Sequence, residues 1–183
     1  MEQQNKSIER RAVAERAKAE GRKISGYAAV FNSPSEDLGG FTEYITANAF
    51  EGVLERSDVF AYLNHNPERG VLARSKGGEG SLTLSIDKKG LKYEFEAPNT
   101  ALGEEVLEGV KRGDIGGSSF AFIVDKDEWS KDYKTRTITK IKELYDVSPV
   151  YSPAYPDTSV AVAERDRKTS LDRYFQELKD KLK

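Results

Sequence analysis

The chain has 183 residues, a length that suits one domain with short terminal segments. Its 29 Lys and Arg residues are balanced by 31 Asp and Glu residues, and a net charge of −2 provides no overall positive field for a nucleic acid backbone. The absence of cysteine excludes disulfides, cysteine nucleophiles and thiolate metal sites, and the single histidine argues against a zinc site. We therefore expect no nucleic acid partner, no metal and no cofactor.

Both ends of the chain are charged. Residues 1–22 are expected to form an arm, helical or disordered, because its few apolar residues offer little surface for packing. This arm lacks the apolar segment of a secretory signal, and no apolar run is long enough to cross a membrane, so we expect a soluble, cytoplasmic-type protein. Residues 164–183 are expected to form a tail with an amphipathic helix, whose apolar stripe comprises Leu171, Tyr174, Phe175, Leu178 and Leu182.

The domain between these segments, residues 23–163, is predicted to consist mainly of strands. In chain order, strands are expected over 23–31, 59–65, 71–74, 82–86, 91–95, 118–124 and 135–150. Alternating apolar residues on either side of a polar turn predict a hairpin from 82 to 95, and a second hairpin joins the last two strands. Helices are expected over 48–56, capped by Thr46, and from the cap Thr100 to Lys111, before Gly113. This pattern predicts an α+β fold, a mostly antiparallel β-barrel flanked by helices.

The single histidine leaves one candidate base if the chain performs serine chemistry. A serine hydroxyl needs an adjacent base, and a carboxylate can orient the imidazole. His65 ends an apolar run, Ser119 follows a pair of glycines, and Asp146 lies in the last strand. Strand alternation places each of these three residues on a face with small aliphatic residues, and points Ser118 and Glu143 the other way. The choice between Asp146 and Glu143 as third member stays open.

Each candidate also has a purely structural interpretation. A lone histidine at a strand end is more often a surface or core residue than a catalyst. Ser119 would then be a strand serine bonded to the backbone, and Asp146 an edge charge that opposes aggregation. The protein would be a non-catalytic assembly module, with the stripe in 171–182 docking on a partner.

Several segments, taken in order, resemble the prohead (capsid-maturation) protease family of tailed phages over about residues 23–163. They are GYAAVFN at 26–32, FTEYI at 41–45, AF at 49–50, LNHN at 63–66, GL at 90–91, GSSFAF at 117–122, DVSPV at 146–150 and PAYP at 153–156. The resemblance implies a herpesvirus-protease-like (assemblin) fold and a serine endopeptidase with His65, Ser119 and Asp146 as catalytic residues. It also implies that the enzyme acts inside the assembling prohead, in the host cytoplasm. The implied partners are the major capsid protein or its scaffold segment, and a second copy of the chain in a homodimer.

Three features depart from the related proteases. Herpesvirus relatives have a second histidine as third member, which this chain lacks, so a carboxylate or a dyad is required. Ser118 stands where the family often has an apolar residue, and strand alternation favours Ser119 as the nucleophile. No arginine lies between Asp146 and Arg165, so backbone N–H groups near Gly116, Gly117 or residues 151–156 are the expected oxyanion donors.

Overall fold

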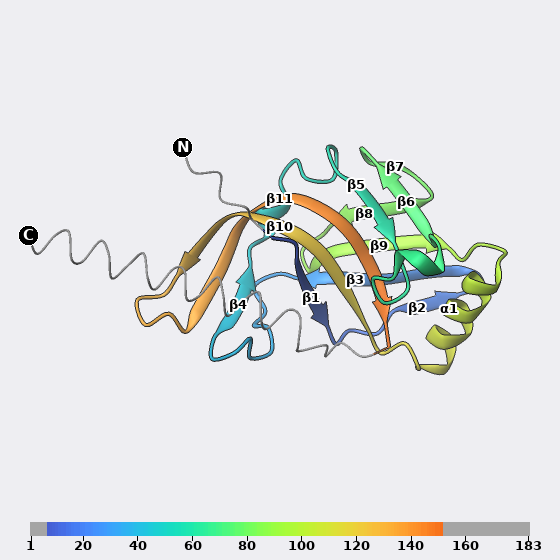
Figure 1. The fold of residues 1–183 in the computed structure, drawn as a ribbon, viewed down its shortest axis with the longest axis horizontal. Coiled ribbons are helices and arrows are strands. Elements are labelled where there is room, and N and C mark those ends of the chain that lie inside the picture. The colour runs from blue at the N-terminus through green and yellow to red at the C-terminus, as the bar shows by residue number, and fades with distance from the viewer. Residues whose placement is uncertain (1–6, 152–183) are drawn as a thin grey trace, which may run out of the picture.

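The computed structural model describes residues 7–151, which form two β-sheets, one α-helix and two short 3-10 helices (Figure 1). The larger sheet has the order β1-β10-β11-β5-β6-β7, with β4 also paired to β11, and the smaller sheet has the order β2-β3-β9-β8. The larger sheet comprises β1 (Glu9–Val13), β4 (Thr42–Ile45), β5 (Asp58–Ala61), β6 (Ala73–Lys76), β7 (Glu79–Gly80), β10 (Gly117–Trp129) and β11 (Thr135–Val150). The smaller sheet comprises β2 (Lys18–Glu20), β3 (Lys23–Val30), β8 (Leu82–Ile86) and β9 (Gly90–Glu96).

The structure confirms the hairpin β8–β9 and the helix α1 (Ala101–Arg112). The Asp87 carboxylate accepts hydrogen bonds from the backbone N–H groups of Lys89 and Gly90 and so closes the hairpin turn. Thr100 caps α1 by accepting from the N–H of Gly103, and Gly113 ends the helix in the left-handed conformation at φ 82°. Contacts between residues close along the chain therefore fix where the hairpin turns and where the helix begins and ends.

Four expected elements are shorter, shifted or different in the structure. The helix expected over 48–56 is only η1 (Ala47–Phe50), and Thr46 donates its hydroxyl to the carbonyl of Ile138 instead of capping the helix. The strand expected over 59–65 is β5, which stops at Ala61, and the strand expected over 71–74 is β6. The expectation of helix or disorder in 1–22 is wrong for β1 and β2, which are strands. The C-terminal helix expected within 164–183 lies outside the described residues.

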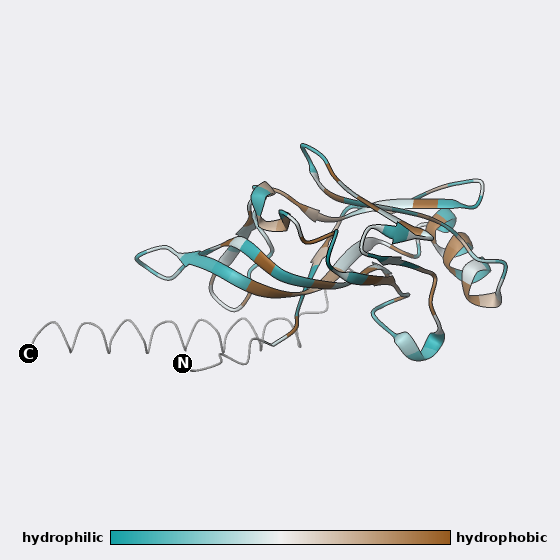
Figure 2. Cartoon of the chain, turned by 90° about the horizontal axis from the view of Figure 1, so that it is seen from above, coloured by the Kyte–Doolittle hydropathy of each residue, from teal (hydrophilic) through white to brown (hydrophobic). Residues whose placement is uncertain are grey.

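The long hairpin β10–β11 forms the centre of the larger sheet. Its antiparallel register runs from Gly117 opposite Val150 to Trp129 opposite Arg136, with several shifts. Strands β4 and β5 add to β11 in parallel, and β1 adds to β10 antiparallel, so the fold is mostly but not wholly antiparallel. The outer half of the hairpin is hydrophilic, whereas its inner half carries apolar residues (Figure 2). The inner half therefore packs in the core and the outer half projects from it.

One main hydrophobic core lies between the two sheets. Phe120 and Phe122 of β10 stack at a centroid distance of 4.5 Å, and Phe50 of η1 packs on Phe120 at 6.0 Å. Leu144 and Val147 of β11 are also fully buried in this cluster. One face of β10 and β11 thus supplies the core, which leaves the opposite face for other roles.

A buried network of charges fastens β1 to the larger sheet. Arg11 donates to the carboxylates of Glu9 and Glu43, and Arg136 of β11 donates to the same two carboxylates. All four residues are at most 6% exposed. Burial alone would raise the pKa of Glu9, but the attraction of Arg11 and Arg136 outweighs it and lowers the pKa. The network explains why a charged N-terminal segment forms an ordered strand.

The two sheets approach each other closely at Gly26 of β3. A Cβ atom at this position would lie 2.6 Å from the hydroxyl oxygen of Tyr93 and 3.0 Å from Oγ of Ser118. Tyr93 is fully buried, and burial raises its pKa to about 12, so its phenol stays neutral. The lack of a side chain at Gly26 therefore allows β3 to approach β10 closely at Ser118.

We predict that Arg136→Met lowers the free energy of unfolding by about 3–5 kcal/mol, because it removes one of the two arginines that neutralise the buried carboxylates of Glu9 and Glu43. Urea denaturation followed by circular dichroism measures this loss. The matched control is Arg74→Met, which breaks an ion pair to Asp58 with side chains 47% and 40% exposed. The control should cost about 1 kcal/mol or less, and an equal loss in both variants would contradict the role given to the buried network.

We also predict that Gly26→Ala lowers the free energy of unfolding by about 1–3 kcal/mol, because the added methyl group overpacks the contact with Tyr93. The neighbouring change Ser25→Ala, at a half-buried position of the same strand, should alter it by less than about 0.5 kcal/mol. Thermal and urea denaturation of the two variants give the comparison. If Gly26→Ala and the unchanged chain have the same free energy of unfolding, the close approach at Gly26 does not limit the packing of the two sheets.

Candidate active site

The structure brings His65, Ser119 and Asp146 together in one hydrogen-bonded chain. His65 Nε2 lies 2.6 Å from Ser119 Oγ, and His65 Nδ1 lies 2.5 Å from Asp146 Oδ1. Both imidazole nitrogens are therefore engaged, one with a hydroxyl and the other with a carboxylate. This arrangement links a potential nucleophile, a base and an orienting acid.

Strand β10 presents Ser119 and Ser118 on opposite faces. Ser119 is paired with Ser148 and shares a face with Ala121, which is paired with Asp146. Ser118 points into the core, where its Oγ lies 2.8 Å from the phenolic oxygen of Tyr93. Of the two adjacent hydroxyls, Ser119 is thus the one within reach of His65, as strand alternation predicts.

A β-bulge aims Asp146 at the histidine. Ala121 pairs with Asp146 but Phe122 pairs with Leu144, so Tyr145 is an extra residue on β11. The bulge places Leu144 in the core and Asp146 on the opposite face, with Ser119. Strand alternation without a bulge wrongly assigns Asp146 and Leu144 to the same face.

The same bulge corrects the argument against Glu143. This residue pairs with Ile123 and therefore lies on the Asp146 side of the sheet rather than on the opposite side. Its carboxylate accepts a hydrogen bond from the Tyr145 hydroxyl at 2.8 Å. Contact, not strand parity, distinguishes the two carboxylates, because only Asp146 bonds to His65.

His65 lies in a tight turn after β5, not in the strand itself. Asn64 and His65 have φ values of 57° and 56°, in the left-handed region that costs a non-glycine residue about 1–3 kcal/mol. The turn is held by the Asn64 N–H, which donates to the carbonyl of Pro149, and by the Asn66 N–H, which donates to that of Leu63. The turn carries His65 across to the face of Asp146, although Ala61 of β5 points into the core. The predicted shared face of His65 and Ala61 is therefore wrong.

Polar neighbours on both sides support the turn and the carboxylate. Asn64 Oδ1 accepts from the N–H of Tyr151, and Asn66 Oδ1 accepts from the N–H of Glu68 at the start of η2 (Pro67–Arg69). Ser148 donates its hydroxyl to Asp146 Oδ1 at 2.7 Å. Sequence reasoning gave Ser148 no role, although its spacing of two residues from Asp146 in a strand places both on one face.

The backbone of β1 also enters the site. Ser119 Oγ lies 2.8 Å from the carbonyl oxygen of Arg11, to which it donates. Ser119 is 3% exposed and the His65 side chain is 13% exposed. The site is thus screened from solvent, partly by a strand that the sequence did not predict.

The proposed oxyanion donors have other partners where the structure describes them. The Gly116 N–H donates to the carbonyls of Val150 and Tyr151, and Gly117 pairs with Val150 in the sheet. Residues 152–156 lie outside the described part of the chain. Gly116 and Gly117 therefore serve to join β10 to the end of β11.

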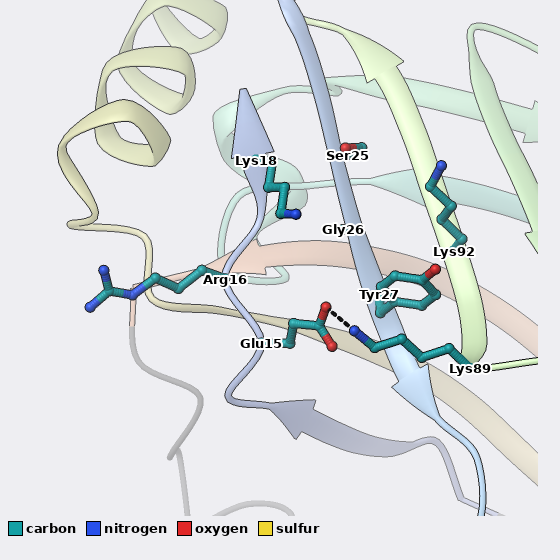
Figure 3. Close-up of a pocket in the computed structure, with 8 residues that line it drawn as sticks. All are labelled: Glu15, Arg16, Lys18, Ser25, Gly26, Tyr27, Lys89 and Lys92. Carbon is teal, nitrogen blue, oxygen red and sulfur yellow. Dashed lines mark hydrogen bonds and ion pairs between the residues drawn. The ribbon is translucent and has the colours of Figure 1, made fainter. Parts of the chain in front are cut away.

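A separate pocket lies between the β1–β2 link and strands β3 and β9 (Figure 3). It is lined by Glu15, Arg16 and three lysines, among others, and contains no residue of the His65 site.

No group of three potential metal ligands gathers within residues 7–151. In the same range, no helix is both long and apolar enough to cross a membrane.

Comparisons with known proteins show the family of this chain and a likeness in fold. A family model described as caudovirus prohead serine protease matches residues 6–173. The structure is similar in fold to that of the bacteriophage T4 capsid assembly protease, gp21, with a TM-score of 0.53 at 9% identity, over 81% of this chain and 99% of that chain. No curated protein matches the sequence. Because the family model covers most of the chain and includes the segments that carry His65, Ser119 and Asp146, this protein belongs to the caudovirus prohead serine proteases.

Proposed function

We propose that this chain is a prohead maturation protease that cleaves peptide bonds with Ser119 as nucleophile, His65 as base and Asp146 as the orienting carboxylate. The observation that carries this assignment is the continuous chain Ser119–His65–Asp146, with distances of 2.6 Å and 2.5 Å. Family membership supports the reaction class, and the single histidine leaves one candidate for the base.

Acylation begins when Ser119 Oγ attacks the carbonyl carbon of the scissile bond and its proton passes to His65 Nε2. The resulting imidazolium is stabilised by Asp146, which holds the N–H at Nδ1 and so fixes the tautomer. His65 then gives the proton to the leaving amine as the C–N bond breaks, which leaves an ester on Ser119. A water molecule, deprotonated by the same histidine, then attacks the ester carbonyl carbon; His65 donates the proton to Ser119 Oγ as the ester bond breaks and the carboxylic acid product leaves.

The hydrogen bond from Ser148 to Asp146 Oδ1 serves this mechanism. The same oxygen faces His65 Nδ1, so the hydroxyl fixes the carboxylate in the orientation that the histidine needs. Ser148 is completely buried, so water does not compete for this bond. Asp146 therefore acts as a preorganised acceptor.

We infer the substrates from the family. The enzyme would cleave the scaffold, or the scaffold-like segment of the major capsid protein, and its own terminal regions, inside the assembling prohead in the host cytoplasm. A homodimer is part of this proposal, as is closure of the two sheets into the barrel of herpesvirus assemblins. Support for the closure comes from the contacts of β3 with β1 and β10, which join the two sheets.

Ser119→Ala and His65→Ala should each abolish cleavage of the scaffold while leaving the chain folded. A serine-directed fluorophosphonate should label the unchanged chain but not Ser119→Ala, as read by mass spectrometry. Ser118→Ala is the matched control and should still be labelled, because its hydroxyl faces Tyr93. Scaffold cleavage by Ser119→Ala would exclude the assignment, and capsid binding without labelling would favour a non-catalytic assembly module.

Asp146→Asn should lower the rate constant for cleavage by about 10⁴-fold, because the amide stabilises the wrong tautomer and not the imidazolium. Glu143→Gln should keep nearly the full rate, because its carboxylate contacts Tyr145 and not His65. Peptide-cleavage kinetics with both variants measure the difference. A large loss in Glu143→Gln alone would assign the orienting role to that residue.

A further inference from the structure

A row of paired residues crosses the larger sheet through Asp146. Ala121 of β10 lies opposite Asp146, and on the other side Asp146 lies opposite Phe60 of β5. Phe60 in turn lies opposite Arg74 of β6. Residues that are paired in register point their side chains to the same face of a sheet. These four side chains therefore lie side by side on the face that carries the candidate active site.

Asp146 has a small neighbour on one side and a large neighbour on the other. Towards β10, Ala121 offers only a methyl group. Towards β5, the adjoining strand lies about 4.8 Å away and presents the ring of Phe60. The side chain of Asp146 is only 8% exposed. On the β5 side, the ring of Phe60 is thus the group that separates this carboxylate from water.

Tyr62 extends the aromatic surface beside Asp146. Its ring stacks on that of Phe60, with centroids 5.5 Å apart and planes inclined by 8°. Burial and then the negative charge of Asp146 raise the pKa of Tyr62, so the phenol lies within electrostatic range of this carboxylate. No hydrogen bond within residues 7–151 involves the Tyr62 hydroxyl. Tyr62 therefore contributes its ring rather than a hydrogen bond.

Arg74 holds the ring of Phe60 in place from the β6 side. Its guanidinium carbon lies 4.8 Å from the centroid of the Phe60 ring, in a cation–π contact. Asp58 fixes the guanidinium by accepting hydrogen bonds from Nε at 2.7 Å and from Nη2 at 2.5 Å. Because this ion pair is exposed, it adds little stability. Its effect is to orient the aromatic pair.

The hydrogen bonds of Asp146 occupy only one of its two oxygens. Within the described residues, His65 and Ser148 both bond to Oδ1. A carboxylate accepts at both oxygens, so a water molecule beside Asp146 would compete for these sites and change the orientation of the group. Water also weakens the attraction between the carboxylate and the imidazolium. Exclusion of water therefore strengthens the contact of Asp146 with His65.

We propose that Phe60 and Tyr62 form an aromatic wall that keeps water from Asp146, and that this wall maintains the contact between Asp146 and His65 during acyl transfer. Phe60 and Tyr62 are positioning residues, because they act on His65 through Asp146. This inference rests on the proposed function, in which His65 is the base and Asp146 orients it.

The first test measures how fast the Nδ1 proton of His65 exchanges with water. His65 is the only histidine of the chain, so in a chain with nitrogen-labelled histidine the NMR signals of the imidazole need no assignment. Phe60→Ala should speed the exchange about tenfold or more, because water then reaches Asp146. Phe60→Leu keeps apolar bulk at this position and should exchange nearly as slowly as the unchanged chain.

Tyr44→Ala is the matched control for the exchange test. Tyr44 is also a half-buried aromatic residue of the larger sheet, but it lies opposite Thr137, near the start of β11 and far along the strand from Asp146. This variant should leave the exchange unchanged. Equal exchange rates in Phe60→Ala and Tyr44→Ala would overturn the proposal.

The second test separates the chemical step from binding by labelling Ser119 with a fluorophosphonate at several concentrations. Phe60→Ala and Tyr62→Ala should each lower the limiting rate constant about 10–100-fold, because His65 is then less well oriented. The concentration for half the limiting rate should stay nearly the same, since both rings lie on the Asp146 side of His65. Tyr62→Phe keeps the ring and should label like the unchanged chain. A change in the half-limiting concentration alone would overturn the proposal, because the rings would then contact the probe.

Failure of this inference and failure of the proposed function give different results. Circular dichroism first establishes that each variant is folded, and if Phe60→Ala does not fold, Tyr62→Ala and Tyr62→Phe carry both measurements. The exchange test needs no catalysis. If Phe60→Ala speeds the exchange but no form is labelled, the proposed function fails and the aromatic wall stands. If the unchanged chain is labelled and the alanine variants exchange and label at its rates, the aromatic wall is wrong and the proposed function stands.

Discussion

The antiparallel pairing of β10 with β11 is the interaction on which both the core and the candidate active site depend. One face of this pair supplies buried apolar residues such as Phe120 and Val147, and the other face carries Ser119 and Asp146. Paired backbone groups leave little freedom for either strand. The pairing thus fixes the distance between Ser119 and Asp146, and the turn after β5 brings His65 between them.

The bulge at Tyr145 and the left-handed turn at Asn64–His65 complete this geometry. Both are local departures from regular structure, and both re-aim a side chain that a regular strand would point into the core. Their cost is met by the surrounding hydrogen bonds, such as that from Asn64 to Pro149. Irregular backbone therefore concentrates where the chemistry needs it.

Strand β1 contributes both to the stability of the fold and to the shielding of the candidate active site. The ion pairs of Arg11 with Glu9 and Glu43 join this strand to the body of the protein. The same strand brings the Arg11 carbonyl against Ser119. Strand β1 therefore both stabilises the larger sheet and shields Ser119 from solvent.

Residues that are close along the chain account for the local elements, and the single histidine narrows the candidate base to His65. The cap at Thr100, the turn at Asp87 and the alternation in 82–95 depend on neighbouring residues, and a single histidine admits no other base of its kind. The tertiary structure decided what depends on distant partners. Residues 9–13 form a strand because Glu43 and Arg136 neutralise the charges of Arg11 and Glu9. Asp146 rather than Glu143 meets His65 because the turn at Asn64–His65, which no sequence pattern shows, brings the imidazole beside Asp146.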